Sequence, residues 1–286
     1  MTDVLRYTAF TTDPAGGNPA GIVLHADSLS DEQMLAIAAE VGYSETAFVL
    51  REGRTPPHLG LRFFSALDEV AFCGHATIAT AVALAERGEG EGGTVLFETP
   101  AGEVEVSTTE VDGVLRASLT SVPTRTRDVP EDALGEALEA LRLSTADLAD
   151  DLPPLLSYAG NEHLVLALAS RQRLAELDYA FSRLKDLMTA EGWTTAQLVW
   201  REDEGTFHSR NPFPVGGVVE DPATGSAAAA LGGYLLSRGL VPGPRTFRVV
   251  QGVDMGRPSE LLVDVRPDDR RVTVSGAAVE LPVGGD

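Results

Sequence analysis

The sequence predicts an α+β protein made of two related halves, each with a curled mixed sheet around one apolar central helix. Three observations support this prediction. Short strand-like segments alternate with helix-like segments along the whole chain. An internal repeat relates residues 73–88 to residues 224–239. The repeated segment is rich in alanine and poor in charge, which is typical of a helix that is buried on all sides and wrapped by a sheet.

In the first half, turn-forming residues separate the predicted elements. The run DPAGGN at 13–18 supplies Asp, Pro and Gly between two strands. Residues 28–42 have a Ser/Asp start, an acidic first turn, spaced apolar residues and a closing glycine, which predicts a capped amphipathic helix. A second helix is expected to begin near Gly74. Strands are expected at 4–12, 19–26, 45–51, 58–66, 94–100, 102–110 and 113–120.

The second half repeats this mixture. Helices are expected at 130–143, near 171–192 and from Gly225. Strands are expected at 163–169, 196–203, 205–210, 246–252, 260–266 and 271–281. Residues 121–130 contain two prolines among Ser, Thr and Arg, and we interpret them as a linker. The predicted halves are therefore residues 1–120 with roughly 276–286, and residues 130–275.

The repeat places a glycine followed by a polar residue at the start of each central helix. Six of its sixteen aligned positions are identical, and four positions upstream Glu69 aligns with Glu220. The backbone N–H groups in the first turn of a helix lack partners and carry partial positive charge, which suits a carboxylate or an oxyanion. His75 and Ser226 follow the two glycines, so two such helix starts facing each other would form one anion-binding cleft.

Composition narrows the class of protein. A hydrophobic content of 43% supports a folded core. The net charge of −21 opposes binding to nucleic acid or to an anionic membrane surface, which leaves small-molecule chemistry or protein partners. No apolar run reaches the roughly 18 residues of a membrane span, and the first residues do not resemble a signal peptide. We therefore expect a cytoplasmic protein with a small-molecule substrate.

Three kinds of chemistry are not favoured by the residue types. Cys73 is the only cysteine, so one chain contains neither a disulfide nor a pair of catalytic thiols. Lys185 is the only lysine and its spacing suggests an exposed helix face, which argues against Schiff-base chemistry. The five histidines show no paired ligand spacing, so the sequence predicts no metal site.

Five segments resemble one known family. They are AGGNPAGIVL at 15–24, SETAFVL at 44–50, LRFF at 61–64, CGHATIATA at 73–81 and EDPATGSAAAALGGYL at 220–235. In this order they are similar to the phenazine-biosynthesis PhzF-like isomerases and, more distantly, to diaminopimelate epimerase. The resemblance implies the diaminopimelate epimerase-like fold, with an active site between the halves. It also implies an isomerase without a cofactor, usually a homodimer.

The resemblance also implies roles for individual residues. Family members of known activity use a glutamate of the SETAF block to move a proton between carbons of trans-2,3-dihydro-3-hydroxyanthranilate, and this glutamate corresponds to Glu45. The remaining residues implied in catalysis or substrate binding are matched by motif position. The catalytic set is Glu45, His75 and Asp221, and the substrate-binding set is Asn18, Gly74, Gly225 and Ser226.

Each of these residues also has a purely structural interpretation. Glu45 could be a surface carboxylate or a helix cap, although a proton-shuttling base needs partial burial, which the apolar residues after it allow. His75 could be a buried, hydrogen-bonded histidine. Asp221 and Ser226 could be helix caps, and Asn18 could be a turn former.

Further alternatives remain open. Arg62 and Arg210 are either clamps for a substrate carboxylate or plain ion pairs. Cys73 is interpreted as a small buried residue, with a reactive thiolate as the less favoured alternative. The same fold could serve a single-base racemase or a cyclase on another amino-acid-like substrate, or a non-catalytic protein that binds small acids.

Overall fold

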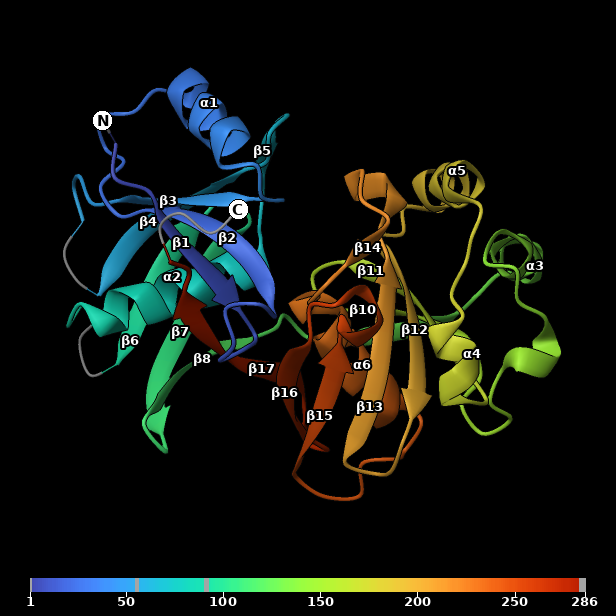
Figure 1. The fold of residues 1–286 in the computed structure, drawn as a ribbon. Coiled ribbons are helices and arrows are strands. Elements are labelled where there is room, and N and C mark those ends of the chain that lie inside the picture. The colour runs from blue at the N-terminus through green and yellow to red at the C-terminus, as the bar shows by residue number, and fades with distance from the viewer. Residues whose placement is uncertain (1, 55–56, 90–92, 283–286) are drawn as a thin grey trace. The chain divides into compact units, whose positions relative to one another are not determined.

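The computed structural model describes residues 2–54, 57–89 and 93–282. The chain divides into two compact units (Figure 1). The N-terminal unit comprises Met1–Thr120 with Ser275–Asp286, and the C-terminal unit comprises Ser121–Val274. Residues 283–286, which the sequence analysis assigned to the N-terminal half, lie outside the described residues.

In the N-terminal unit, strands surround a buried helix. The elements in chain order are β1 (Leu5–Ala9), β2 (Asn18–Val23), α1 (Asp31–Val41), β3 (Thr46–Leu50), β4 (His58–Phe64), β5 (Glu69–Val70), α2 (Gly74–Glu86), β6 (Thr94–Thr99), β7 (Gly102–Val111), β8 (Val114–Thr120) and the second half of β17 (Asp269–Glu280). The pairings run from β1 through β2, β3, β4, β6, β7 and β8 to β17, which pairs with β1 again. The strands therefore close around α2, whose residues 75–84 are all buried.

Helix α1 covers the outer face of this sheet, as its amphipathic pattern predicts. Ser30 and Gln33 form a reciprocal capping box at its start, and Gly42 ends it in the left-handed conformation, with a φ of 74°. Its buried residues Met34 and Ala38 pack against side chains from β2, β3 and β4. The predicted helix at 28–42 is therefore confirmed, with bounds shortened at both ends.

In the C-terminal unit, strands again pack against a buried helix. The elements are β9 (Arg125–Asp128), α3 (Glu131–Ala140), η1 (Thr145–Asp147), β10 (Leu155–Tyr158), β11 (Glu162–Ala167), α4 (Arg171–Ala175), α5 (Phe181–Glu191), β12 (Thr195–Arg201), β13 (Thr206–Pro212), η2 (Pro214–Gly216), β14 (Glu220–Asp221), α6 (Gly225–Ser237), β15 (Arg245–Gln251), η3 (Val253–Met255), β16 (Ser259–Arg266) and the first half of β17. The sheet order is β9, β10, β11, β12, β13, β15, β16. It is antiparallel except at β11–β12 and β13–β15.

The two faces of this sheet differ in chemistry. On β11 and β12, Leu164, Leu166 and Leu198 belong to an apolar cluster with residues of α3, α4 and α5, which cover the outer face. Because side chains alternate along a strand, His163 and Thr195 point the other way, towards α6. The contact between His163 and Ser226 on α6 agrees with this assignment.

Helix α6 lies very close to its neighbours. A Cβ atom added at Gly233 would be 2.5 Å from the Cβ of Thr124, a distance that side chains do not tolerate. The α2 residue aligned with Gly233 in the internal repeat is Val82. The C-terminal central helix therefore requires glycine where the N-terminal one carries a branched side chain.

The predicted linker at 121–130 is wrong. Residues 125–128 form β9, which pairs with β10. Before it, the amides of Ser121 and Thr124 donate to the carbonyls of Val272 and Arg270. Pro and Ser/Thr composition suggested a free connection, but hydrogen bonds to β17 make this segment part of the C-terminal unit.

The single helix expected near 171–192 is two helices, α4 and α5. The guanidinium of Arg210 donates to the carbonyls of Leu174 and Ala175, which end α4. The amide of Ala180 donates to the carbonyl of Ala140 at the end of α3. These bonds come from distant segments, so helical periodicity alone does not reveal the break.

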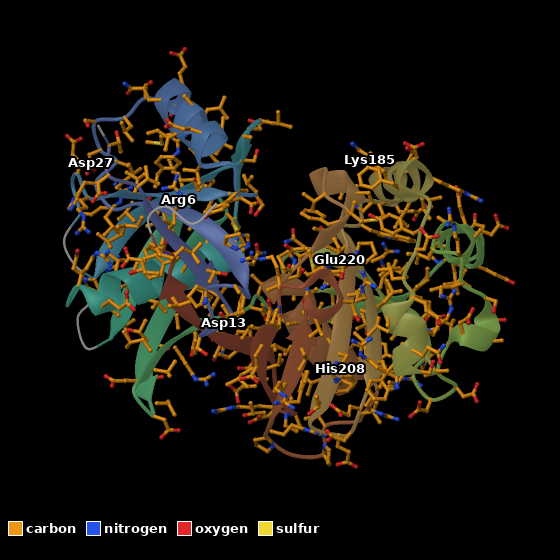
Figure 2. The ribbon with its side chains drawn as sticks, in the orientation of Figure 1. Arg6, Asp13, Asp27, Lys185, His208 and Glu220 are labelled. Carbon is orange, nitrogen blue, oxygen red and sulfur yellow. The ribbon has the colours of Figure 1, made fainter. Side chains whose placement is uncertain are left out.

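Two expectations about the surface can be compared with the structure. Lys185 is exposed on α5, as its spacing predicts (Figure 2). Within the described residues, none of the helices combines the length and the apolar composition that a bilayer crossing requires.

Candidate functional site

The start of α2 gathers three chemically active side chains from two segments. Glu45 lies directly before β3, which runs parallel to β2 with Thr46 opposite Gly21. Cys73 is the N-cap residue of α2, and His75 is in the first turn. Asn18, at the first position of β2, contacts the same histidine. We call Asn18, Glu45, Cys73 and His75 the N-terminal site.

Distances within the N-terminal site are short. Glu45 Oε2 lies 3.4 Å from His75 Nε2 and 3.5 Å from Cys73 Sγ. Cys73 Sγ lies 3.4 Å from His75 Nδ1 and 3.7 Å from His75 Nε2. The side chains of Glu45 and His75 are only 15% and 8% exposed. A carboxylate, a thiol and an imidazole therefore share one partly buried space.

Hydrogen bonding to Asn18 bears on the tautomer of His75. Asn18 Nδ2 lies 3.2 Å from His75 Nδ1. With the amide in this orientation, Nδ2 donates to Nδ1, so the imidazole proton resides on Nε2 and points to Glu45 Oε2. Ser44 Oγ, 3.5 Å from Nε2, lies on the same side of the ring. In this arrangement the imidazole accepts from Asn18 at Nδ1 and faces the Glu45 carboxylate with Nε2.

The same three side chains are a potential set of metal ligands. One donor atom from each of Glu45, Cys73 and His75 lies within 4.8 Å of the others. The sequence analysis predicted no metal site, which stays a prediction, but it did not foresee this group of donor atoms. The prediction examined spacing between histidines, whereas the group combines three residue types and brings Glu45 from 28 residues upstream of Cys73.

The start of α6 is the corresponding place in the C-terminal unit. Asp221 closes β14, and its carboxylate accepts a 2.6 Å hydrogen bond from the Thr224 hydroxyl. Gln251 holds the intervening turn: its Nε2 donates to the carbonyl of Asp221, and its Oε1 accepts from the amide of Thr224. We call Asp221, Thr224, Gly225, Ser226, Gln251 and His163 the C-terminal site.

His163 is an uncharged member of the C-terminal site. It is fully buried, and loss of hydration lowers its pKa to about 3. Its Nδ1 lies 2.8 Å from Thr195 Oγ1, and its Nε2 lies 3.1 Å from Ser226 Oγ. The neutral imidazole therefore orients the hydroxyl of Ser226 and cannot serve as a cation at neutral pH.

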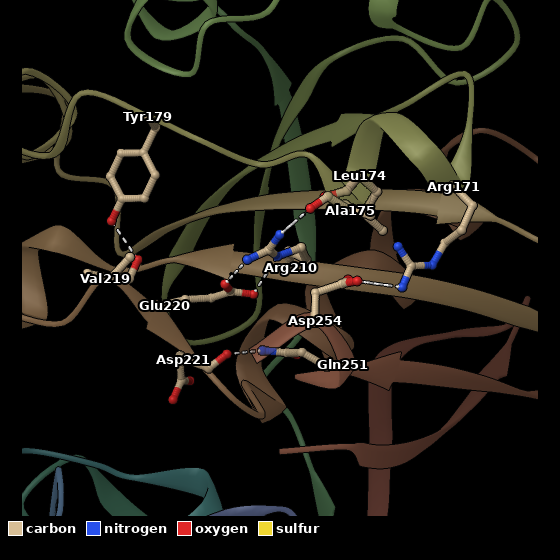
Figure 3. A network of polar contacts seen from close by, with 10 residues as sticks. All are labelled: Arg171, Leu174, Ala175, Tyr179, Arg210, Val219, Glu220, Asp221, Gln251 and Asp254. Carbon is tan, nitrogen blue, oxygen red and sulfur yellow. Dashed lines mark hydrogen bonds and ion pairs between the residues drawn. The ribbon is translucent and has the colours of Figure 1, made fainter. Parts of the chain in front are cut away.

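An Arg–Glu pair anchors the strand that carries Asp221 (Figure 3). Arg210 donates through Nε and an Nη atom to the two oxygens of Glu220, at 2.9 and 2.5 Å. Burial alone would lower the pKa of Arg210, but the bonds and attraction to Glu220 raise it. The remaining Nη atom donates to the end of α4, 3.0 Å from the carbonyl of Ala175.

The N-terminal unit repeats this pair. Arg62 donates through the same two kinds of nitrogen to Glu69, at 2.7 and 2.8 Å. Glu69 pairs with the residue two positions after Arg62, just as Glu220 pairs with the residue two positions after Arg210. Both arginines are thus ion pairs with internal glutamates, which decides between the two interpretations left open by the sequence.

The structure places the residues expected from the sequence in two groups. Asn18, Glu45, Gly74 and His75 lie together at the start of α2. Asp221, Gly225 and Ser226 lie together at the start of α6. Sequence reasoning missed His163 and Gln251, and for Cys73 it favoured a packing role over a reactive thiolate. In the sequence, His163 and Gln251 are each a single polar residue within an apolar strand, a pattern that only weakly indicates a functional site.

Two duplicated units, each with polar groups at the start of a buried central helix, define a class of protein: those with the diaminopimelate epimerase-like fold. A probable proline racemase from Agrobacterium radiobacter has the same fold: it superposes with a TM-score of 0.65 at 16% identity, over 99% of this chain and 93% of that one. A PhzF-family protein from Bacillus anthracis superposes with a TM-score of 0.88 at 27% identity, over 98% and 96% of the two chains.

Sequence comparison identifies the family. The model of the phenazine biosynthesis-like proteins matches residues 7–284, and the chain belongs to this family. It is 32% identical to the uncharacterized isomerase YfhB of Bacillus subtilis, over 97% of this chain and 96% of that protein. It is 34% identical to the trans-2,3-dihydro-3-hydroxyanthranilate isomerase of Pseudomonas chlororaphis, over 95% and 94%. The protein is an isomerase of this family, which sets aside the interpretation as a non-catalytic binding protein.

Proposed function

We propose that the protein is a cofactor-independent isomerase acting on a small cyclic amino acid of the trans-2,3-dihydro-3-hydroxyanthranilate type. Glu45 removes a proton from a carbon next to an unsaturated system and returns it to another carbon, so substrate and product contain the same atoms. The observation that carries this proposal is the position of Glu45 Oε2, partly buried and 3.4 Å from His75 Nε2. The relative from Pseudomonas chlororaphis supports the choice of substrate.

The other residues take supporting roles in this proposal. His75 donates to Glu45 or shares the proton transfer, and Asn18 sets its tautomer. The first-turn amides of α2, from Gly74 onwards, stabilise negative charge that develops on the substrate. Asp221 accepts a hydrogen bond from the substrate's amino group, and Gly225 and Ser226 bind its acid group.

Turnover in deuterated water tests the proposal. The purified protein is incubated with trans-2,3-dihydro-3-hydroxyanthranilate, and the ring protons are followed by NMR beside Glu45→Gln. We expect the parent to consume the substrate and the variant to be slower by about 10²–10⁴-fold, the usual contribution of a positioned acid or base. Glu40→Gln, which changes an exposed carboxylate on α1, is the matched control and keeps parental turnover.

Two results would contradict the proposal. Equal rates for the parent and Glu45→Gln would remove Glu45 from the proton transfer. Absence of turnover by the parent would reject this substrate, and α-proton exchange in other amino-acid-like acids would then test the single-base racemase alternative.

We also propose that the protein works as a homodimer in the cytoplasm, without cofactor or metal in its catalytic cycle. Light scattering during size-exclusion chromatography measures the oligomeric state, and a monomer mass would contradict the dimer. Turnover by protein dialysed against a chelator tests independence from a bound metal. Cell fractionation tests the location.

A further inference from the structure

The N-terminal site has a composition that its proposed role as a proton shuttle does not require. A carboxylate and an imidazole suffice for proton transfer, yet Cys73, the only cysteine in the chain, lies against both. Thiolate, imidazole and carboxylate are together the ligand types that zinc prefers. Among the residues that the structure describes, this is the one group of three such side chains with close donor atoms.

The spacing of the donor atoms matches a face of a zinc tetrahedron. Zinc binds sulfur at about 2.3 Å and nitrogen or oxygen at about 2.0–2.2 Å, so tetrahedral ligands are separated by about 3.3–3.6 Å. The observed separations are 3.4 Å for Glu45 to His75, 3.5 Å for Cys73 to Glu45 and 3.7 Å for Cys73 to His75 Nε2. The separations suit a cation, but Cys73 Sγ lies nearer to His75 Nδ1 than to Nε2, so coordination also requires the imidazole to turn its Nε2 lone pair towards the sulfur and the carboxylate.

The surroundings supply the remaining requirements. Coordination through His75 Nε2 needs the imidazole proton on Nδ1, and a half-turn of the Asn18 amide presents Oδ1 as its acceptor. Cys73 releases its thiol proton to solvent, so a thiolate and a carboxylate face the divalent cation. The partial positive charge at the start of α2 repels a cation but stabilises the Cys73 thiolate. The net charge of −21 attracts cations to the chain.

We propose that Glu45, Cys73 and His75 form a reversible Zn²⁺ site whose occupation switches off the isomerase. Three protein ligands leave a fourth position for water, the arrangement of an open zinc site. The inhibitory part rests on the proposed function, because the cation uses the same lone pairs of Glu45 and His75 that proton transfer needs. The binding part stands independently of the reaction.

Cobalt spectroscopy tests binding without an activity assay. Co²⁺ replaces Zn²⁺ in such sites, and a bound thiolate produces a charge-transfer absorption. Because Cys73 is the only cysteine, this absorption reports one site. We expect saturation at one Co²⁺ per chain, loss of the absorption when Zn²⁺ is added, and no loss with excess Mg²⁺, which prefers oxygen ligands.

Three variants locate the ligands. Cys73→Ser removes the absorption, and Glu45→Gln weakens Zn²⁺ binding in calorimetry. For Cys73→Ser we expect Zn²⁺ binding to be at least about 100-fold weaker, because loss of a residue that only hydrogen-bonds to a metal ligand already costs about 10–100-fold in affinity. His208→Asn is the matched control and binds like the parent, because His208 lies 3.0 Å from one carboxylate, that of Glu202, and against the ring of Trp200, which is no zinc ligand. Absence of the absorption in the parent, or unchanged Zn²⁺ affinity in Cys73→Ser, overturns the site.

An activity measurement tests the switch. The ratio of turnover with and without Zn²⁺ is compared within each protein, so differences in basal activity cancel. The parent and His208→Asn lose activity as Zn²⁺ is added. Cys73→Ser requires an at least about 100-fold higher Zn²⁺ concentration for the same loss of activity. Zinc binding without inhibition overturns the switch while the site stands. Failure of the parent to turn over the substrate contradicts the proposed function alone, since the cobalt result still decides the site.

Discussion

The starts of α2 and α6 occupy equivalent positions in the internal repeat but carry different chemistry. At α2, Glu45, Cys73 and His75 are three groups that can gain or lose a proton, all in contact. At α6, Ser226 is oriented by His163, which burial keeps neutral. Two helix starts related by the internal repeat therefore differ in chemistry, and in the proposed function the first serves proton transfer and the second binds polar groups of the substrate.

The Arg–Glu pairs show a second difference between the units. Their geometry is the same, but the side chains of Arg210 and Glu220 are 12% and 4% exposed, against 24% and 32% for Arg62 and Glu69. In the buried pair, Arg210 also donates a hydrogen bond to the carbonyl of Ala175 at the end of α4. The same Arg–Glu contact therefore contributes differently to the free energy of unfolding in the two units, because the cost of breaking an ion pair rises with its burial.

The largest expected effect separates the two helix starts kinetically. We expect Glu45→Gln to lower kcat by about 10²–10⁴-fold, because in the proposed function it removes the group that moves the proton. Ser226→Ala raises KM by about 10–150-fold, the equivalent of one lost hydrogen bond to a charged group. Steady-state kinetics on both variants measures the split. A loss of kcat of equal size in Ser226→Ala would show that the halves do not divide the work in this way.

The next effect concerns the two ion pairs. Arg210→Met leaves Glu220 buried without its partner and lowers the free energy of unfolding by about 3–5 kcal/mol. Arg62→Met breaks two more exposed pairs, with Glu69 and Asp31, and costs about 0.4–2 kcal/mol, since each such pair contributes about 0.2–1 kcal/mol. Denaturant unfolding of both variants provides the comparison, with each serving as the control for the other. Equal losses would mean that burial does not distinguish the pairs.

His163 makes the C-terminal site sensitive to acid. Its folded-state pKa of about 3 lies below the unfolded value of about 6.5, so between these values the unfolded chain binds the extra proton. Stability contributed by the neutral imidazole is complete above pH 6.5 and declines as the pH falls, by up to about 1.4 kcal/mol per pH unit.

Unfolding measured between pH 7 and 4 checks this prediction. His163→Gln retains hydrogen-bonding groups but cannot be protonated, so its stability falls less steeply than that of the parent. His208→Gln, which changes a histidine that is not fully buried, serves as the control and follows the parent. Parallel curves for the parent and His163→Gln would contradict the assignment.

The smallest expected effect tests the close packing of α6. Gly233→Ala places a Cβ against Thr124, which cannot move away because its amide and hydroxyl both bond to Arg270. Overpacking of about 1–3 kcal/mol outweighs the helix propensity gain of about 1 kcal/mol. Gly135→Ala, on α3 with open space around it, gains about 0.5–1 kcal/mol. Thermal unfolding of both variants measures the difference, and a stabilised Gly233→Ala would refute it.

The sequence by itself determined the repeated plan and the positions of Glu45, His75, Asp221 and Ser226. Periodicity, capping residues and glycines act over a few neighbouring residues, so α1, α2 and α6 could be predicted from local patterns. Local patterns also placed His75 and Ser226 at the starts of the two central helices, whereas Glu45 and Asp221 were singled out by the family resemblance.

Only the tertiary structure decided how these residues are partnered. It brought Glu45 to Cys73, joined Arg210 to Glu220 and to the end of α4, and buried His163 next to Ser226. Each of these contacts joins segments that are separate in the chain, and no local pattern records which side chains will meet. Burial, which sets the protonation state of His163 and the strength of the Arg210 pair, likewise exists only once the strands have packed around their helix.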